Sequence, residues 1–257
     1  MNNRPSCSEV VRTALDIGEN MVMCGAEINR VEDTVERICR AYGYSDVEVF
    51  SITSLIIVTA NSASDNPITQ TRRIYSNSTA LGKLEKLNAL SREICETLPS
   101  IGYVKEKMTD ILKDKRKLHF SVALGYILTC PAFAMFFGGT LLDALASIPI
   151  AAVLFLADAL VKRKGSNKLL YTFVASLAAG SLAMLFVKLG FGDHADKIMI
   201  GNIMMLIPGL AFTNSLREML CGDTMSGFMR FLEALLISLA IALGFAVPIV
   251  IGGGVSL

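Results

Sequence analysis

The stretch that decides the fold is residues 201–218, GNIMMLIPGLAFTNSLRE. It is long and apolar enough to cross a bilayer, and further apolar stretches of similar length flank it. Pro208 and Gly209 lie near its centre, and Asn214, Arg217 and Glu218 lie toward its C-terminal end. We interpret the stretch as an interrupted transmembrane helix rather than a core helix of a water-soluble protein.

Two interpretations of the interruption are open. A broken helix at membrane depth leaves backbone N–H and C=O groups that protein neighbours or a water-filled cavity must satisfy, and transporters bind substrates at such places. Proline is also common in membrane helices, where it often does no more than kink the helix. Taken alone, residues 201–218 favour the ordinary kink.

Charge divides the 257-residue chain into two unlike parts. Only eight of the 24 Lys and Arg residues and seven of the 23 Asp and Glu residues follow Lys117. We therefore expect a cytoplasmic α+β domain over residues 1–117 and a transmembrane domain of five helices over residues 118–257. The net charge of +1 gives no reason to expect binding to nucleic acid.

Hydrophobic periodicity predicts a small sheet with helices on one face in the first part. The helices are expected over Ser8–Cys24, Glu27–Tyr42, Thr79–Leu98 and Ile101–Leu118. Three antiparallel strands are expected over Asp46–Ile52, Ser54–Ala60 and Ile68–Tyr75, the last after the turn-like residues Ser64–Pro67. Glu27, Arg30 and Glu32 form a polar motif, either a solvated helix face with weak ion pairs or a surface that binds a regulator or faces the transport path.

The motifs of ATP-driven pumps and of common hydrolases do not occur in the chain. It has no G-x-x-x-x-G-K-[ST] phosphate loop, no G-x-G-x-x-G turn and no G-x-S-x-G elbow. The six cysteines form no C-x-x-C pair, and His119 and His194 stand apart from any second ligand. We therefore predict no enzyme, no cofactor and no metal site, and free thiols. The first residues also lack the apolar core of a signal peptide.

Five membrane spans of about 20 residues are expected in the second part. They are approximately Leu118–Phe137, Leu141–Val161, Leu169–Lys188, Lys197–Leu216 and Gly227–Ile251. Basic residues gather before the first span, between the second and third, and between the fourth and fifth. The positive-inside rule then places the N-terminal domain in the cytoplasm and the C-terminus outside the cell membrane.

Two segments carry a resemblance to a known family. MCGAEINRVED over residues 23–33 resembles the G-A-E-x-x-R-V-E segment of the threonine/serine exporter (ThrE) family, and PGLAFTNSLRE over residues 208–218 resembles its P-G-x-x-x-T-N-x-x-R-[DE] segment. Since some members have about ten spans and this chain has five, it is similar to the YjjP-type half of a split system. The resemblance implies export of threonine and serine or of a dicarboxylate such as succinate. It also implies a second, YjjB-like five-helix membrane subunit and an oligomer.

The first hypothesis is therefore a secondary exporter with its substrate site at the broken helix. Freed amides near Gly209 are expected to hold a substrate carboxylate, as a helix N-terminus holds an anion. The expected site comprises Asn202, Pro208, Gly209, Thr213, Asn214, Arg217, Glu218 and Asp223. In it, Thr213 and Asn214 hydrogen-bond the substrate, Arg217 attracts its carboxylate, and Glu218 and Asp223 bind its ammonium group or carry a proton.

Two alternatives stay open. In the first, the chain is a membrane-anchored hydrolase-like protein, with Glu27 or Glu32 as acid or base near Arg30. In the second, the cytoplasmic domain regulates or organises an assembly for which the membrane part is a scaffold. Neither alternative includes autonomous transport.

Overall fold

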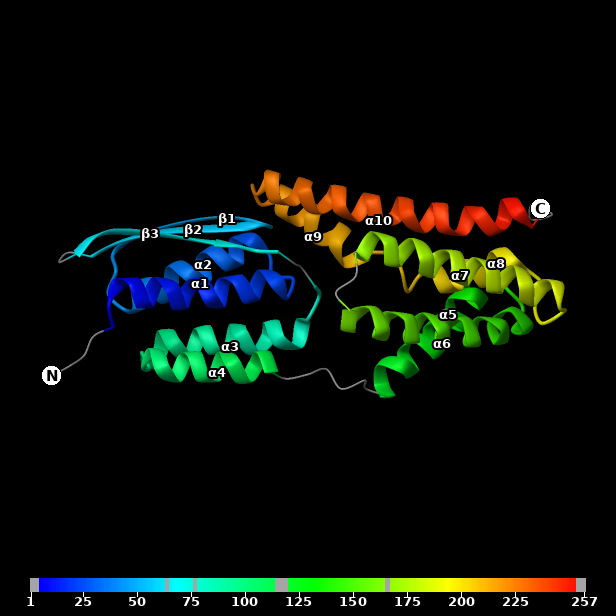
Figure 1. Ribbon diagram of the computed structural model, residues 1–257, viewed down its shortest axis with the longest axis horizontal. Helices are drawn as coiled ribbons and strands as arrows, with labels where there is room; N and C mark the ends of the chain where they lie inside the picture. Colours follow the sequence, from blue (N-terminus) through cyan, green and yellow to red (C-terminus); the bar gives the residue numbers. More distant parts are fainter. Residues whose placement is uncertain (1–4, 63–64, 76–77, 114–119, 165–166, 253–257) are drawn as a thin grey trace. The chain divides into compact units, whose positions relative to one another are not determined.

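The computed structural model describes residues 5–62, 65–75, 78–113, 120–164 and 167–252 (Figure 1). The chain divides into two compact units, each described here by itself. Unit 1 comprises Met1–Lys115 and Thr213–Arg230, and unit 2 comprises Arg116–Phe212 and Phe231–Leu257. The predicted domain boundary between residues 117 and 118 lies outside the described residues, as do Lys115, Arg116 and Lys117, and the division stays a prediction. The compact units differ from the predicted domains because Thr213–Arg230, which was predicted to belong to the transmembrane domain, lies in unit 1.

Unit 1 contains the predicted three-stranded antiparallel sheet and its helices. Its elements are α1 (Cys7–Met23), α2 (Ile28–Ala41), β1 (Asp46–Ile52), β2 (Leu55–Ser62), β3 (Asp65–Arg73), α3 (Leu81–Thr97) and α4 (Ile101–Lys113). The strand order is β1-β2-β3, and Val49 pairs with Val58, which in turn pairs with Gln70. The predicted turn at Ser64–Pro67 is wrong in part, because β3 begins at Asp65 and includes Pro67. A strand at the edge of a sheet tolerates proline because its N–H is not needed there.

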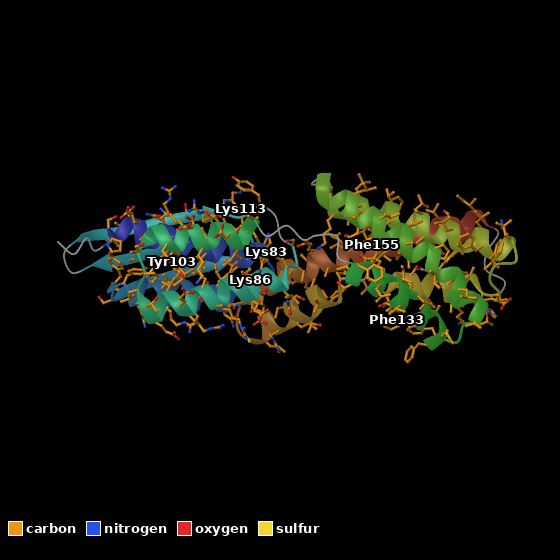
Figure 2. All side chains as sticks on the ribbon, turned by 90° about the horizontal axis from the view of Figure 1, so that it is seen from below. Lys83, Lys86, Tyr103, Lys113, Phe133 and Phe155 are labelled. Atoms are coloured by element: carbon orange, nitrogen blue, oxygen red, sulfur yellow. The ribbon has the colours of Figure 1, made fainter. Side chains whose placement is uncertain are left out.

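Three layers make up this part of unit 1. The sheet forms one layer, α1 and α2 pack against one of its faces, and α3 and α4 cover the other side of those helices (Figure 1). Helix α1 therefore lies between the sheet and the α3–α4 pair, and Val10, Leu15 and Ile17 are fully buried. Helices α3 and α4 are antiparallel: near the start of α3, the Lys83 ammonium donates to the carbonyl of Leu112 at the end of α4, at 2.7 Å (Figure 2).

The second half of the chain is entirely helical where it is described. Its helices are α5 (Phe120–Phe136), α6 (Leu141–Lys164), α7 (Lys168–Lys188), α8 (Ala195–Ile203), α9 (Gly209–Leu220) and α10 (Thr224–Ile251). Three segments of the described chain are long and apolar enough to cross a membrane: Leu141–Leu160, Lys168–Lys188 and Thr224–Ile251. Helix α5 is apolar but shorter, at 17 residues. The predicted fourth span, Lys197–Leu216, is not one helix but is divided between α8 and α9.

Helices of unit 2 approach one another closely at glycines. A Cβ atom added to Gly201 of α8 would lie 2.5 Å from the carbonyl oxygen of Cys130 on α5. One added to Gly244 of α10 would lie 2.7 Å from the carbonyl oxygen of Phe173 on α7. Backbones that meet this closely are typical of helix pairs in membranes, where small residues let dispersion contacts form.

The six cysteines are free thiols in this structure. Four of them, Cys7, Cys24, Cys39 and Cys130, are buried, and Cys95 is half-buried. Cys221 is exposed, in the turn between α9 and α10.

Candidate functional site

The break between α8 and α9 is the first part of the candidate site. Helix α8 ends at Ile203, whose carbonyl oxygen accepts hydrogen bonds from the N–H groups of Leu206 and Ile207 at 2.9 and 3.1 Å. Helix α9 begins at Gly209, so the predicted interruption at Pro208 and Gly209 is confirmed. Among the amides expected to be free near Gly209, that of Gly209 itself has a partner, because its N–H donates to the carbonyl of Ile207 at 2.9 Å.

Asn202 lies in the last turn of α8, immediately before the break. Its side chain is fully buried. The amide nitrogen Nδ2 donates to the carbonyl of Ile198 one turn earlier, at 2.9 Å. The amide oxygen Oδ1 is buried and has no hydrogen-bond partner among the described residues. The prediction picked out Asn202 by its place before Pro208, and the structure adds this unsatisfied acceptor.

A separate group of candidate residues lies in unit 1, where α9 and α10 contact the start of α2 and the loop before it. The Glu218 carboxylate on α9 accepts a hydrogen bond from the N–H of Ile28 at 3.2 Å. The Arg230 guanidinium on α10 donates to the carbonyl of Ala26 at 2.8 Å. Its Nε atom also lies 3.3 Å from Oε2 of Glu218. The two motif segments that carry the family resemblance therefore touch, although 190 residues separate Ile28 from Glu218.

Glu218 acts as a cap for α2 from a distant part of the chain. Glu27, the N-cap residue of α2, gives no side-chain cap, and the first N–H groups of a helix need acceptors. The Glu218 carboxylate, only 1% exposed, supplies one of them at the positive end of the helix dipole. Burial raises the pKa of Glu218, while Arg230 and the Ile28 N–H lower it and the neighbouring Asp223 and Glu27 raise it further.

The three residues of the predicted polar motif take different roles. Glu27 accepts a hydrogen bond from Arg217 at 2.7 Å, and its second oxygen lies 3.8 Å from Nε of Arg30. Arg30 and Arg217 have exposed side chains, whereas the side chain of Glu27 is half-buried, so water reaches both pairs from the arginine side. Glu32 instead accepts from the N–H and hydroxyl of Ser51 at 2.6 and 3.1 Å, which ties α2 to β1.

Glu32 shares an electrostatic environment with Asp223. Burial raises the pKa of Glu32, the hydrogen bonds from Ser51 oppose this, and the charge of Asp223 adds to it. Asp223 itself has a buried Oδ2 atom without a hydrogen-bond partner among the described residues. Because Glu32 and Glu218 both have structural hydrogen bonds, their raised pKa values do not by themselves indicate acid–base catalysis.

The predicted site residues fall into two groups. Asn202, Pro208 and Gly209 belong to unit 2, and the other five belong to unit 1. Within unit 1, Thr213 and Arg217 are exposed, Asn214 and Asp223 are half-buried, and Glu218 is buried. The structure thus brings Arg217 and Glu218 to the α1–α2 loop, and leaves Thr213 and part of Asn214 accessible on α9.

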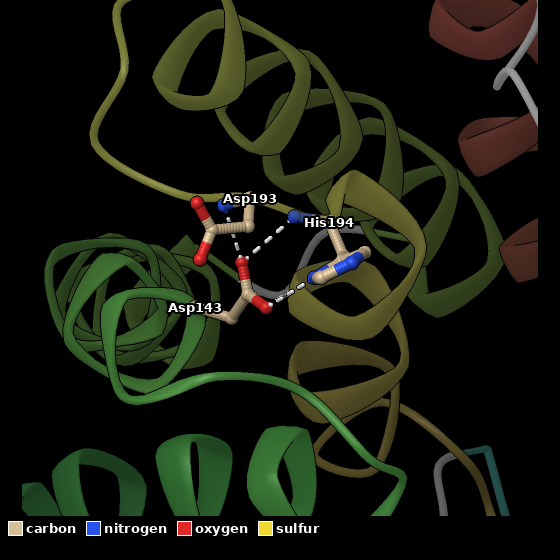
Figure 3. Close-up of side chains that lie close together, drawn as sticks. All are labelled: Asp143, Asp193 and His194. Carbon is tan, nitrogen blue, oxygen red and sulfur yellow. Dashed lines mark hydrogen bonds and ion pairs between the residues drawn. The ribbon is translucent and has the colours of Figure 1, made fainter.

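A polar cluster in unit 2 was missed by sequence reasoning (Figure 3). Asp143 is fully buried. Its Oδ1 accepts from the N–H groups of Asp193 and His194 at 2.7 and 2.8 Å. Its Oδ2 accepts from the N–H of Thr140 at 2.9 Å and contacts Nδ1 of His194 at 3.0 Å. Thr140 and Asp143 form the T-x-x-D capping pattern before an apolar run, which was the available sequence signal.

The same cluster is the group of described side chains that could hold a metal ion. One ligand atom each from Asp143, Asp193 and His194 lies within 4.8 Å of the others. Both oxygens of Asp143 already accept hydrogen bonds, however, and Asp193 accepts one from the Thr140 hydroxyl at 2.7 Å. The hydrogen bonds therefore give the Asp143 carboxylate a structural role, because they join the start of α6 to the loop before α8.

Comparison with known proteins agrees with the resemblance of the two motifs. The sequence model of a family described as "Putative threonine/serine exporter" matches residues 12–252. The "Probable threonine/serine exporter" of Mycobacterium tuberculosis is 23% identical over 246 residues, covering 94% of this chain and 46% of the relative. The "Threonine/serine exporter" of Corynebacterium glutamicum is 24% identical over 248 residues, covering 93% and 50%.

A shorter relative matches from end to end. The "Probable succinate transporter subunit YjjP" of Escherichia coli is 22% identical over 245 residues, covering 95% of each chain. The present chain thus spans about half the length of the two exporter relatives and nearly the whole of this one. No solved structure matches.

Proposed function

The chain belongs to the threonine/serine exporter family, and from this membership we propose that it is a subunit of a secondary transporter that exports small metabolites across the cytoplasmic membrane. The family is one of exporters rather than enzymes. Together with the three apolar helices that are long enough to cross a membrane, this membership makes the chain a membrane protein. The observation that carries the proposal is the family match over residues 12–252, joined to an apolar helix that breaks at Pro208. The substrates proposed are threonine and serine, or a dicarboxylate such as succinate, after the names of the relatives.

The proposed membrane arrangement has five spans. Helices α6, α7 and α10 have the length and apolarity of spans, α5 is the first span, and Lys197–Leu216, divided between α8 and α9, is an interrupted fourth. The N-terminal domain lies in the cytoplasm and the C-terminus outside, because the sequence places its basic residues on one side.

The proposed substrate site uses the accessible polar side chains of α9. Thr213 and Asn214 hydrogen-bond the substrate, and the exposed guanidinium of Arg217 attracts its carboxylate at the cytoplasmic entry. Two further carboxylates, the buried Glu218 of α9 and Asp223 in the turn after it, supply negative charge for an ammonium group or a proton. The amide of Gly209 has no part in this proposal, since it already donates to Ile207.

A second membrane subunit completes the transporter in this proposal. The two exporter relatives are about twice as long as the match, and the relative of equal length is called a subunit. We assign the half of these exporters that this chain does not match to a YjjB-like five-helix partner in an oligomeric assembly.

Transport by the reconstituted complex tests the proposal. The full chain and its partner subunit are placed in liposomes, and counterflow of radiolabelled threonine, serine and succinate is measured. We expect counterflow of at least one substrate, and a loss of about tenfold or more in Asn214→Ala and Arg217→Ala if each makes one charge-assisted hydrogen bond. Arg37→Ala is the matched control, because Arg37 is likewise an exposed arginine in a surface ion pair. Undiminished flux in both site variants would refute the site, and absence of all counterflow would refute the function.

A regulatory role of the N-terminal domain is the second candidate. Its support is the contact of Glu218 and Arg230 with the α1–α2 loop, because α9 carries the proposed substrate residues. Deleting the residues before Leu118 separates the cases. Loss of transport supports a role in gating, whereas transport that survives makes the domain accessory.

A further inference from the structure

The sheet of unit 1 has one covered face and one open face. Helices α1 and α2 pack against the covered face, and in the described part of the chain no helix packs along the other (Figure 1). The open side of the sheet nevertheless carries large apolar side chains, since Phe50 is 60% exposed and Tyr75 is 86% exposed. Large apolar side chains that share one exposed surface often mark a contact between proteins. The open face is therefore a candidate interaction surface, separate from the proposed substrate residues on α9.

Strand alternation and register place nine side chains on the open face, in three rows of three. Ile56 and Val58 of β2 are fully buried on the covered face, so the residues between and beside them point the other way. The centre of the array is Ile57, which pairs with Phe50 on β1 and with Thr71 on β3. The two neighbouring rows are Glu48, Thr59 and Thr69 on one side, and Ile52, Leu55 and Arg73 on the other.

Opposite charges occupy opposite corners of this array. Glu48 and Arg73 are exposed, and they lie on either side of Ile57 along one diagonal. The other diagonal runs from Ile52 through Ile57 to Thr69 and carries no charge. A two-fold axis that lies along the second diagonal exchanges the ends of the first. When two such faces meet about this axis, Glu48 of each copy faces Arg73 of the other.

The remaining side chains also match about the same axis. Phe50 of one copy faces Leu55 of the other, and Ile57 faces its own counterpart on the axis. Thr59 of one copy faces Thr71 of the other. The strands of the two sheets then cross at a steep angle, as they do in the orthogonal class of sheet packing. Apolar side chains thus meet apolar ones, threonines meet threonines, and each charge meets its opposite.

We propose that the open face of the sheet binds a second copy of this chain in a two-fold symmetric contact. The occupant is a second copy because the face is complementary to itself in both charge and apolarity. Three strands spaced about 4.8 Å apart give a face only about 14 Å wide, which is small for a dimer that forms in solution. Anchoring of both copies in one membrane raises their effective concentration, so a small contact suffices. The inference deepens the oligomeric assembly of the proposed function and rests on it in that respect.

A crosslink on the two-fold axis tests the contact. In a Cys221→Ser background, which removes the exposed thiol, Ile57→Cys places one thiol of each copy on the axis. Stacked sheets lie about 10 Å apart, which is too far for a disulfide, so a short bis-maleimide reagent is used to join the thiols. The full chain is reconstituted in liposomes with its partner subunit. We expect severalfold more linked dimer with Ile57→Cys than with Lys105→Cys, which is the control at an exposed position on α4.

Exchange of the two corner charges is the second test, made in the same Ile57→Cys chain. Glu48→Arg and Arg73→Glu each set like charges face to face at two symmetric places. Each change should lower the yield of linked dimer at a fixed low ratio of protein to lipid by about tenfold. The double variant restores opposite charges and should recover the yield. Glu106→Arg, which reverses an exposed charge on α4, is the control and should leave it unchanged.

The outcomes separate this contact from the export function. Equal linking with Ile57→Cys and Lys105→Cys would overturn the contact, as would a product that joins the chain to its partner subunit alone. A double charge variant that links no better than the single variants would also overturn it. Because these measurements count crosslinks and not transported molecules, absence of all counterflow would remove the function and leave the contact standing.

Discussion

Two regions of the molecule each enclose a buried carboxylate, and they satisfy it in different ways. Around Asp143 in unit 2, N–H groups from Thr140, Asp193 and His194 all donate to the carboxylate. Around Glu218 in unit 1, one N–H donates and a guanidinium lies nearby, while Oε2 has no hydrogen bond of good geometry. The first carboxylate is fixed by the main chain, and the second depends on an opposite charge. Removing the carboxylate or its partner should therefore lower the free energy of unfolding more in the first region than in the second.

The largest loss of stability is expected for Asp143→Ala. The change leaves three main-chain N–H groups without an acceptor, so the free energy of unfolding should fall by about 3–5 kcal/mol. Chemical unfolding of the purified chain in detergent measures this. Asp196→Ala is the control, because the carboxylate of Asp196 is partly exposed and pairs only with its neighbour Lys197 among the ion pairs described. A similar small effect of both changes would contradict the described role of Asp143.

The next largest loss is expected for Arg230→Met. It leaves the Glu218 carboxylate buried without its positive neighbour and should lower the free energy of unfolding by about 2–4 kcal/mol. Adding Glu218→Leu should restore much of the loss, because the uncompensated charge is then gone. A double variant whose loss equals the sum of the single losses would show that the two side chains are not coupled.

A smaller and pH-dependent effect is expected for Glu218→Gln. Since burial raises the pKa of Glu218, the folded state binds its proton more tightly than the unfolded state does. Relative to Glu218→Gln, the wild type should therefore lose stability as the pH rises from about 4.3 through the raised pKa. Unfolding midpoints across this range measure the change.

Glu93→Gln provides a control of opposite sign. Hydrogen bonds from Lys107 and Tyr103 lower the pKa of Glu93. Relative to that variant, the wild type should gain stability as the pH rises from the lowered pKa to about 4.3. If the stability difference from the wild type changed with pH in the same direction for both variants, the opposite pKa shifts of Glu218 and Glu93 would be contradicted.

The smallest change in stability is expected for Arg217→Ala. The Arg217 guanidinium pairs with Glu27 at the surface, and such pairs contribute less than about 1 kcal/mol. We expect the unfolding midpoints of Arg217→Ala and Arg37→Ala to lie within a degree or two of the wild type. Any loss of transport in Arg217→Ala could then be attributed to the loss of a functional contact and not to unfolding. A large loss of stability would instead mean that the contact between α9 and the start of α2 depends on this pair.

Local patterns in the sequence predict the elements well. Alternation over Asp46–Ile52 gives β1 with its observed bounds, and Pro208 with Gly209 marks the place where α8 and α9 separate. Both signals lie within a few residues of the feature they specify. The T-x-x-D pattern at Thr140–Asp143 is equally local and was overlooked.

Contacts between distant segments explain what the sequence could not give. Nothing near Glu218 in the chain indicates that its carboxylate caps α2, since Ile28 lies 190 residues away. The ion pair of Glu27 with Arg30 follows from their spacing on the helix, whereas the pair of Glu27 with Arg217, 190 residues away, does not. The sequence also could not show that the Gly209 amide has a partner, because this depends on how tightly the chain turns toward the Ile207 carbonyl.

The exposure of Cys221 has a practical consequence. A thiol needs access to react, so a maleimide reagent should modify the cysteine in the α9–α10 turn in preference to the buried ones. A fluorophore could thus be attached three residues from Glu218 without any substitution in the chain. Its emission would report in real time whether the turn between α9 and α10 moves during the transport that we propose.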